Sequence, residues 1–318
     1  MVSAPTAPAV VIPSWNSAAL LPDCIASIRA QATAVELMVV DNGSSDGSVA
    51  FLEREDIGHI TLPRNVGFAA AVNLGVARTE AASILVLNAD TVLEPDAIER
   101  LAAALAADPG LGGVQPRLLQ LEGSAEDVAM ARLYSAGMAL TADGRAVETG
   151  AGEPQSAGWL RRREIFGVCG AACLLRRELF ADLGGYDESY FSFYEDVDLN
   201  VRGRIAGWRF AYEPEAVVWH VGNASWQAEF RRPGAENARL VARNRLVTQV
   251  RFMPAAALPR VAAVEIGALA RAAAQRRMRA TLRGKLEGLG RLPAALRERR
   301  RLGRSGDLGR PRAWLGRG

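Results

Sequence analysis

Residues 37–48 read Leu-Met-Val-Val-Asp-Asn-Gly-Ser-Ser-Asp-Gly-Ser, four apolar residues that lead into a polar, glycine-containing turn. An apolar run without alternation is typical of a strand that is buried on both faces. Asp-Asn-Gly and Asp-Gly are turn-forming sequences, and a short helix is predicted from Ser48 to about Arg54. The stretch therefore predicts a strand, a loop and a helix, with Asp41 directly after the strand.

The same unit is predicted on both sides of this stretch. Its strands are Val10–Ile12, His59–Leu62 and Ser83–Leu87, and helices follow them, the last running from about Pro95 through Leu105. Apolar strands separated by helices predict an α/β fold with a mostly parallel, Rossmann-like sheet covered on both faces. Ligands of such sheets bind at the carboxyl ends of the strands. Asp41 and Asp90 each follow a strand end, so both are expected at the binding edge.

The second half of the chain is less regular. Residues 121–163 are expected to form strands or loops that line an acceptor site. After them we expect a buried strand over Phe166–Leu175, with close backbone approach at Gly170, and a helix over Arg177–Leu183. A helix is predicted from Glu195, and two further strands precede His220, over Trp208–Tyr212 and Val217–Trp219.

Composition excludes several classes of protein. The chain has 318 residues, of which 49% are hydrophobic and 23% charged, which is typical of a folded globular protein and excludes a disordered tail or a membrane bundle. Three cysteines are too few for a disulfide scaffold and lack the paired spacing of a zinc site. The N-terminus has no signal-peptide pattern, so a cytoplasmic location is expected.

Positive charge is concentrated at the C-terminal end. Residues 260–318 hold 16 basic and 4 acidic side chains, a net charge of +12 within a chain whose total is +3. An Ala- and Arg-rich helix is predicted over Ala255–Arg283, too charged to span a bilayer, and residues 297–318 are expected to be disordered. The helix could pack on the catalytic domain, mediate self-association, or contact an anionic membrane surface peripherally.

Four side chains are candidates for chemistry, although each also has an ordinary structural interpretation. Asp41 and Asp90 could cap turns, and His220 could be a core histidine. Asp196 could stabilise the first turn of a helix by interacting with the helix dipole. Together they suit a nucleotide-diphosphate sugar, whose transfer needs a nucleoside contact, a cation at the diphosphate and a base for the acceptor's proton. Asp41 would contact the nucleoside, and Asp196 would be the base. Asp90 and His220 would be the ligands of Mg²⁺ or Mn²⁺.

Several sequence blocks resemble one enzyme family in the correct order. The blocks are Val10–Asn16, Val39–Ser48, Asn65–Asn73, Leu85–Thr91, Gly170–Arg177, Gly184–Glu188, Phe193–Leu199 and His220–Ser225. Over residues 9–250 the chain resembles an inverting family 2 glycosyltransferase of the GT-A fold, in the bacterial rhamnosyltransferase-like branch. The resemblance implies direct displacement at the anomeric carbon with inversion of configuration.

The resemblance also implies roles for individual residues. Asp196 would be the general base, with Glu195 orienting the acceptor, and Asp90 and His220 would bind Mg²⁺ or Mn²⁺. Residues that would contact the nucleotide sugar are Asp41, Asp46, Asn65, Gly67, Asn73, Asn88 and Gly170. Asn88 stands where the family's Asp-x-Asp motif has its first aspartate, which removes one charge from the metal site.

The resemblance further implies the domains and partners. Residues 1–253 would form the catalytic domain, with a nucleotide-sugar half (9–115) and an acceptor half (116–253), and residues 254–318 a basic helical extension. The donor would be dTDP-rhamnose or a UDP-sugar, and the acceptor a saccharide or a polyprenyl-linked sugar of the bacterial cell surface. A nucleotidyltransferase or a nicotinamide-dependent dehydrogenase would require a glycine-rich phosphate loop after the first strand, and Ser14-Trp15-Asn16 is not one.

A non-catalytic nucleic-acid-binding protein is the alternative from another class, since it could use the basic tail. Such a protein has no need of the four candidate side chains, and no nucleic-acid partner is expected.

Overall fold

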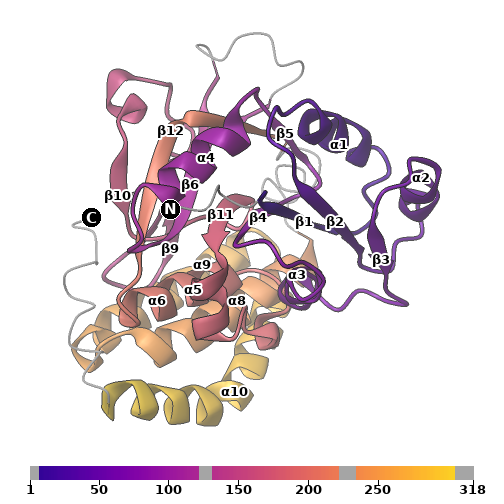
Figure 1. The fold of residues 1–318 in the computed structure, drawn as a ribbon. Helices are drawn as coiled ribbons and strands as arrows, with labels where there is room; N and C mark the ends of the chain where they lie inside the picture. The colour runs from indigo at the N-terminus through magenta and orange to yellow at the C-terminus, as the bar shows by residue number, and fades with distance from the viewer. Residues whose placement is uncertain (1–6, 122–130, 222–233, 305–318) are drawn as a thin grey trace.

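In the described part of the chain, ten strands form one mixed sheet, with helices on both of its faces (Figure 1). The structure is a computed structural model that describes residues 7–121, 131–221 and 234–304. In spatial order the central strands are β10-β12-β6-β11-β4-β1-β2-β3, while β5 and β7 pair with β12 and β6. The predicted α/β fold with a mostly parallel sheet is confirmed.

The N-terminal half contains the predicted strand-and-helix units. Its strands β1, β2, β3 and β4 are parallel, and Ser14 pairs with Asp41, so β1 and β2 end at the same edge. The elements are β1 (Ala9–Ser14), α1 (Leu21–Arg29), β2 (Glu36–Asp41), α2 (Ser48–Arg54), β3 (His59–Thr61), α3 (Phe68–Val76), β4 (Ser83–Leu87), β5 (Thr91–Leu93) and α4 (Ala97–Ala106).

The following segment completes the sheet and adds a small hairpin. Strand β11 lies antiparallel between β4 and β6, whereas β12 runs parallel to β6. The hairpin pairs β8 with β9. The elements are β6 (Leu111–Gln120), β7 (Leu133–Ser135), β8 (Met138–Leu140), β9 (Ala146–Glu148), η1 (Ala157–Leu160), β10 (Arg163–Ile165), β11 (Ala172–Arg176), α5 (Arg177–Leu183), η2 (Glu188–Tyr190), α6 (Glu195–Ile205) and β12 (Arg209–His220).

Two strand predictions need correction. The two strands expected over Trp208–Tyr212 and Val217–Trp219 are one strand, β12, whose register with β6 shifts between Glu213 and Val217. The strand expected over Phe166–Leu175 begins only at Ala172, because side chains take up the backbone groups before it. Val168 exchanges two hydrogen bonds with the Asn200 amide, and the Cys169 N–H donates to Gln115 Oε1.

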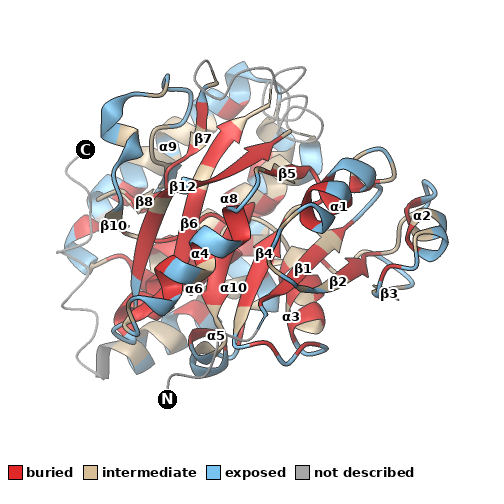
Figure 2. Cartoon of the chain, turned by 45° about the horizontal axis from the view of Figure 1, so that its top comes forward, coloured by how far each residue is buried: buried red, intermediate tan, exposed pale blue. Residues whose placement is uncertain are grey.

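Apolar side chains of the helices pack against the two faces of this sheet. Helices α1 and α4 cover one face with residues such as Ile25 and Leu101, and α3, α5 and α6 cover the other with Val72, Leu179 and Leu199. Figure 2 shows the central strands as buried and the outward helix surfaces as exposed. Burial on both faces explains why the strand sequences lack alternation.

Among the described residues, three helices follow the sheet: α8 (Ala235–Phe252), α9 (Leu258–Ala274) and α10 (Met278–Arg304), with η4 (Ala255–Ala257) before α9. The helix predicted over Ala255–Arg283 is thus interrupted, at Arg276, whose φ of 58° is left-handed. The prediction of disorder from residue 297 is wrong for residues 297–304, which continue α10, and residues 305–318 lie outside the described part. Among the described helices, none is both long and apolar enough to cross a membrane.

Candidate active site

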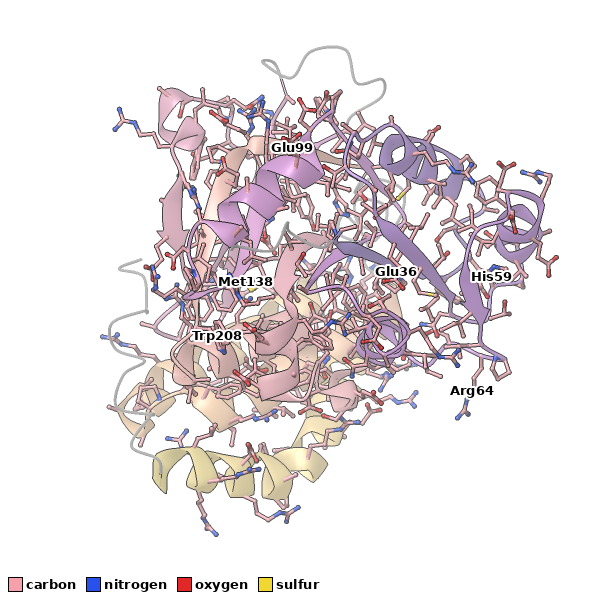
Figure 3. All side chains as sticks on the ribbon, viewed as in Figure 1. Glu36, His59, Arg64, Glu99, Met138 and Trp208 are labelled. Carbon is pink, nitrogen blue, oxygen red and sulfur yellow. The ribbon has the colours of Figure 1, made fainter. Side chains whose placement is uncertain are left out.

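A cavity of about 410 Å³ opens between the sheet edge, the β8–β9 hairpin and the start of α6. Cavities that bind small molecules span ~300 to 1,000 Å³, so its size suits a sugar with part of its nucleotide. Of the predicted site residues, four line it, namely Asn88, Gly170, Glu195 and Asp196. In Figure 3, Met138, another lining residue, lies near the middle of the molecule.

Two backbone amides hold Asp196 at the cavity. Its Oδ2 accepts a hydrogen bond of 3.1 Å from Gly170 N–H, and its Oδ1 accepts one of 2.7 Å from Val197 N–H. The helix begins after Phe193 and Tyr194, which have left-handed φ values of 67° and 72° that are unfavourable for these residue types. Burial raises the pKa of Asp196, and the two amides oppose that rise. A carboxylate with a raised pKa is suited to act as a general base.

Glu195 is the more deeply buried of the two neighbouring carboxyl groups. Its Oε2 has no hydrogen-bond partner among the described residues, and the group lines the same cavity. Burial raises the pKa of Glu195 well above its usual range, and the nearby Asp196 charge adds to the rise. A buried oxygen without a partner is costly, so this atom is available to a ligand hydroxyl.

Gly170 leaves open space in front of Asp196. A Cβ atom built on Gly170 would lie 3.4 Å from Asp196 Oδ2 and 3.6 Å from the Phe68 ring, which are ordinary contacts. The surrounding protein therefore does not require glycine at this position. Because glycine has no side chain, the part of the cavity next to Asp196 stays open.

Asp90 and His220 form a buried pair beside the cavity. His220 Nε2 lies 3.2 Å from Asp90 Oδ1, and the Tyr134 ring, which lines the cavity, lies against the imidazole at 4.3 Å between centroids. Two ligands at right angles on an octahedral Mg²⁺ or Mn²⁺ lie roughly 3 Å apart, so this donor pair fits such an ion. His59, the other histidine, lies at the distant edge of the sheet with β3 (Figure 3).

No group of three or more His, Cys, Asp or Glu ligands occurs within the described ranges. Mg²⁺ usually binds one or two carboxylates and completes its coordination with substrate phosphates and water. The pair is therefore sufficient for an ion that arrives with a diphosphate, and insufficient for a closed structural metal site.

Asp41 is buried at the end of β2, next to the loop before α3. Its Oδ2 accepts from Ser44 N–H at 3.0 Å, whereas Oδ1 has no hydrogen-bond partner in the described structure. Asn42 connects the loop after β2 to the loop before α3. Its side chain accepts a hydrogen bond from Val66 N–H at 2.7 Å and donates one to the Gly67 carbonyl at 3.1 Å. Asp41 does not line the cavity itself, but one of its oxygens lacks a protein partner, as expected for a nucleoside contact.

Four other predicted nucleotide contacts shape loops instead of lining the cavity. Asp46 accepts from Ala18 N–H and from Ser48, and Asn65 accepts from Gly67 N–H. Gly67 has a left-handed φ of 94° and lies against the Phe191 carbonyl, so no other residue fits there. Asn73 exchanges hydrogen bonds with the backbone of Tyr186 and donates to Glu188.

The β8–β9 hairpin belongs to residues 121–163, the segment expected to line an acceptor site, and it does line the cavity, but neither Glu148 nor Arg245 of α8 was predicted as a site residue. Glu148 on β9 lines the cavity and accepts from Ser135 Oγ at 2.6 Å. Burial, with a contribution from the Asp196 charge, raises the pKa of Glu148 to about 7. Arg245 on α8 also lines the cavity. The Asp143-Gly144 sequence is a hairpin turn signal that could have located this hairpin.

A mixed sheet covered by helices on both faces, with a buried acid at the start of α6 beside an Asp–His pair, is the arrangement of this α/β fold. The chain belongs to glycosyl transferase family 2, whose model matches residues 9–184. Membership of this family is what the resemblance of the sequence motifs implied.

Individual proteins agree with this assignment. An N-acetylglucosaminyl-diphospho-decaprenol L-rhamnosyltransferase of Mycobacterium tuberculosis is 30% identical over 58% of this chain and 66% of that protein. An N-acetylglucosaminyltransferase of Mesorhizobium japonicum is 29% identical over 66% of this chain and 50% of its own length. The match thus spans half of one of these two relatives and 66% of the other, less than two thirds of either.

Solved structures support the fold. A mannosyltransferase from Pyrobaculum calidifontis, solved with GDP-Man and Mn²⁺, has a TM-score of 0.55 at 18% identity, covering 90% of this chain and 88% of that one. At this identity the likeness establishes the GT-A fold alone.

Proposed function

We propose that the protein is an inverting glycosyltransferase that moves a sugar from a nucleotide-diphosphate sugar to a hydroxyl of a polyprenyl-diphosphate-linked saccharide in bacterial cell-surface polysaccharide synthesis. We favour dTDP-rhamnose as the donor, with UDP-sugars next, because a relative is named as a rhamnosyltransferase that acts on a diphospho-decaprenol. The observation that carries the proposal is the amide-held Asp196 facing a cavity beside the Asp90–His220 pair.

The chain's own residues supply the steps of the transfer. Asp196 takes the proton of the acceptor hydroxyl as its oxygen bonds to the anomeric carbon, and the bond from that carbon to the diphosphate breaks in the same step. Asp41 holds the nucleoside, Glu195 orients the acceptor, and Asn88 and Gly170 border the donor sugar. Asp90 and His220 would hold Mg²⁺ or Mn²⁺, which when bound neutralises charge on the leaving diphosphate.

Donor hydrolysis tests this function without knowledge of the acceptor. The protein is incubated with dTDP-rhamnose and a panel of UDP- and GDP-sugars, each with Mg²⁺ or Mn²⁺, and release of the nucleoside diphosphate is measured. One donor should be hydrolysed slowly, and the same donor should raise the melting temperature of the protein. Hydrolysis of none of them, together with no thermal stabilisation by any, would contradict the proposal.

We further propose that the protein works peripherally at the inner face of the cell membrane through α10. Four leucines spaced four, three and seven residues apart share one face of this helix and are exposed: Leu282, Leu286, Leu289 and Leu296. Exposed arginines lie alongside them, including Arg279, Arg297 and Arg300. An apolar stripe flanked by arginines is typical of a helix that binds an anionic membrane surface.

Flotation with vesicles that contain anionic lipid tests the contact. The variant Leu286→Gln/Leu289→Gln should lose most of the bound fraction, because it removes apolar area without changing charge. Leu160→Gln, which alters an exposed leucine in η1, is the matched control and should bind as wild type does. Equal flotation of all three proteins would overturn the membrane contact.

A further inference from the structure

A second cavity adjoins the active-site cavity. It measures about 210 Å³ and lies between α8, α9 and α10. Phe193, Val241 and Arg245 line both cavities, so the two share one wall. A group bound in the second cavity would therefore lie next to the space that Asp196 faces.

Three arginines line this second cavity, and the described lining contains no acidic side chain. Arg245 pairs with Glu265 at 2.7 Å, and Glu265 also contacts Lys285. Arg271 and Arg277 have no carboxylate partner in the described part of the chain, and Arg271 is exposed. Glu265 is shared between Arg245 and Lys285, so the charges of Arg271 and Arg277 are left to attract an anion.

The remaining wall of the cavity is mainly apolar. Small side chains from α8 and α9 form it, namely Ala238, Val241, Ala242, Ala268 and Ala272. Guanidinium groups bind phosphate oxygens in pairs of parallel hydrogen bonds, and alanine surfaces contact hydrocarbon. A ligand that matches both walls carries phosphate groups joined to an apolar chain.

We propose that this cavity binds the diphosphate and the adjoining isoprene units of the polyprenyl-linked acceptor. Arg271 and Arg277 hold the diphosphate, and Arg245 at the shared wall directs the attached saccharide toward Asp196. The inference rests on the proposed function, whose acceptor class it deepens by assigning a binding site. The cavity also lies on the helical part that bears the exposed leucines of α10, so the lipid chain can continue into the membrane surface.

Calorimetry with geranyl diphosphate, a short and soluble isoprenyl diphosphate, tests the site. The titration is made with the donor site filled by the nucleoside diphosphate released in the hydrolysis assay, so that the probe cannot bind there. Removing one charge-assisted hydrogen bond should weaken binding about tenfold or more, so Arg271→Ala/Arg277→Ala should raise the Kd at least tenfold. Arg260→Ala changes an exposed arginine of α9 outside the cavity and should bind as wild type does.

The site would be overturned if geranyl diphosphate did not bind to the wild-type protein, or if it bound equally to wild type and the double variant. Geraniol, which lacks the diphosphate, should bind far more weakly than geranyl diphosphate, and equal binding of the two would also overturn it. Donor hydrolysis by the double variant should match wild type. Failure of the binding site therefore leaves donor hydrolysis intact, whereas failure of the proposed function abolishes hydrolysis in the wild-type protein.

Discussion

Replacing Glu148 with glutamine should make the protein more stable at high pH. Burial raises the pKa of Glu148 from 4.5 to about 7, and the charge of Asp196 makes a smaller contribution to this rise. One pKa unit corresponds to 1.36 kcal/mol, so ionising this group in the folded protein costs roughly 3 kcal/mol relative to the unfolded chain. Glutamine cannot ionise, and it can still accept the hydrogen bond from Ser135.

The raised pKa of Glu148 determines the direction in which stability changes with pH. The folded state binds this proton more tightly than the unfolded chain, so the stabilisation is fully present below about pH 4.5 and is lost as pH rises through 7. Urea unfolding at pH 5, 7 and 9 should give Glu148→Gln a free energy of unfolding near that of wild type at pH 5 and about 3 kcal/mol higher at pH 9. Glu80→Gln, at an exposed position, should show no such divergence.

The charge of Asp196 contributes to the raised pKa of Glu148, so removing that charge should lower the pKa of Glu148. The stability that is lost between pH 5 and pH 9 should therefore be smaller in Asp196→Asn than in wild type. For Glu148→Gln, a stability difference from wild type that stays constant from pH 5 to pH 9 would refute the raised pKa of Glu148.

Three other substitutions test separate parts of the structure. Gly170→Ala should change the free energy of unfolding by less than about 1 kcal/mol, because its Cβ meets only ordinary contacts. The same variant should reduce donor turnover at least tenfold. Turnover equal to that of wild type would contradict the proposal that the donor sugar lies against Gly170. Arg251→Met should cost about 3 to 5 kcal/mol in urea unfolding, because it breaks the 2.7 Å pair with fully buried Asp198; a loss below 1 kcal/mol would count against that ion pair. His220→Ala should raise the Mn²⁺ concentration for half-maximal donor hydrolysis at least tenfold, and an unchanged metal titration would remove His220 from the metal site.

The fold of the N-terminal half was predictable because its signals are local. Apolar runs such as Ser83–Leu87 are buried on both faces of the sheet, and turn sequences such as Asp41–Gly47 lie between the elements. The interruption of the C-terminal helix near Arg276 was not predictable, because alanines and arginines on both sides favour helix. Residues 297–304 were expected to be disordered but continue α10, whose Arg299 donates to the carbonyls of Val250 and Met253 at the end of α8.

The candidate site was predictable where a titratable residue directly follows a strand or begins a helix. Asp196 faces the cavity, and Asp90 meets His220 although the two residues are far apart in the chain. Asn73 and Asp46 have the residue types of ligand contacts, yet their side chains are taken up by backbone groups of neighbouring loops, which only the tertiary structure reveals. The Asp143-Gly144 turn signal could have located the hairpin that contains Glu148, but no local pattern shows that the Glu148 side chain faces the cavity.

Turnover by Asp196→Asn decides whether Asp196 is the base of a nucleotide-sugar transferase. Asparagine keeps the shape of the side chain and can accept one amide hydrogen bond, but it cannot take the acceptor's proton. With the donor identified by hydrolysis, sugar transfer should fall on the order of a thousandfold while the donor's Kd changes less than about twofold. A transfer rate within a few-fold of wild type would contradict the claim.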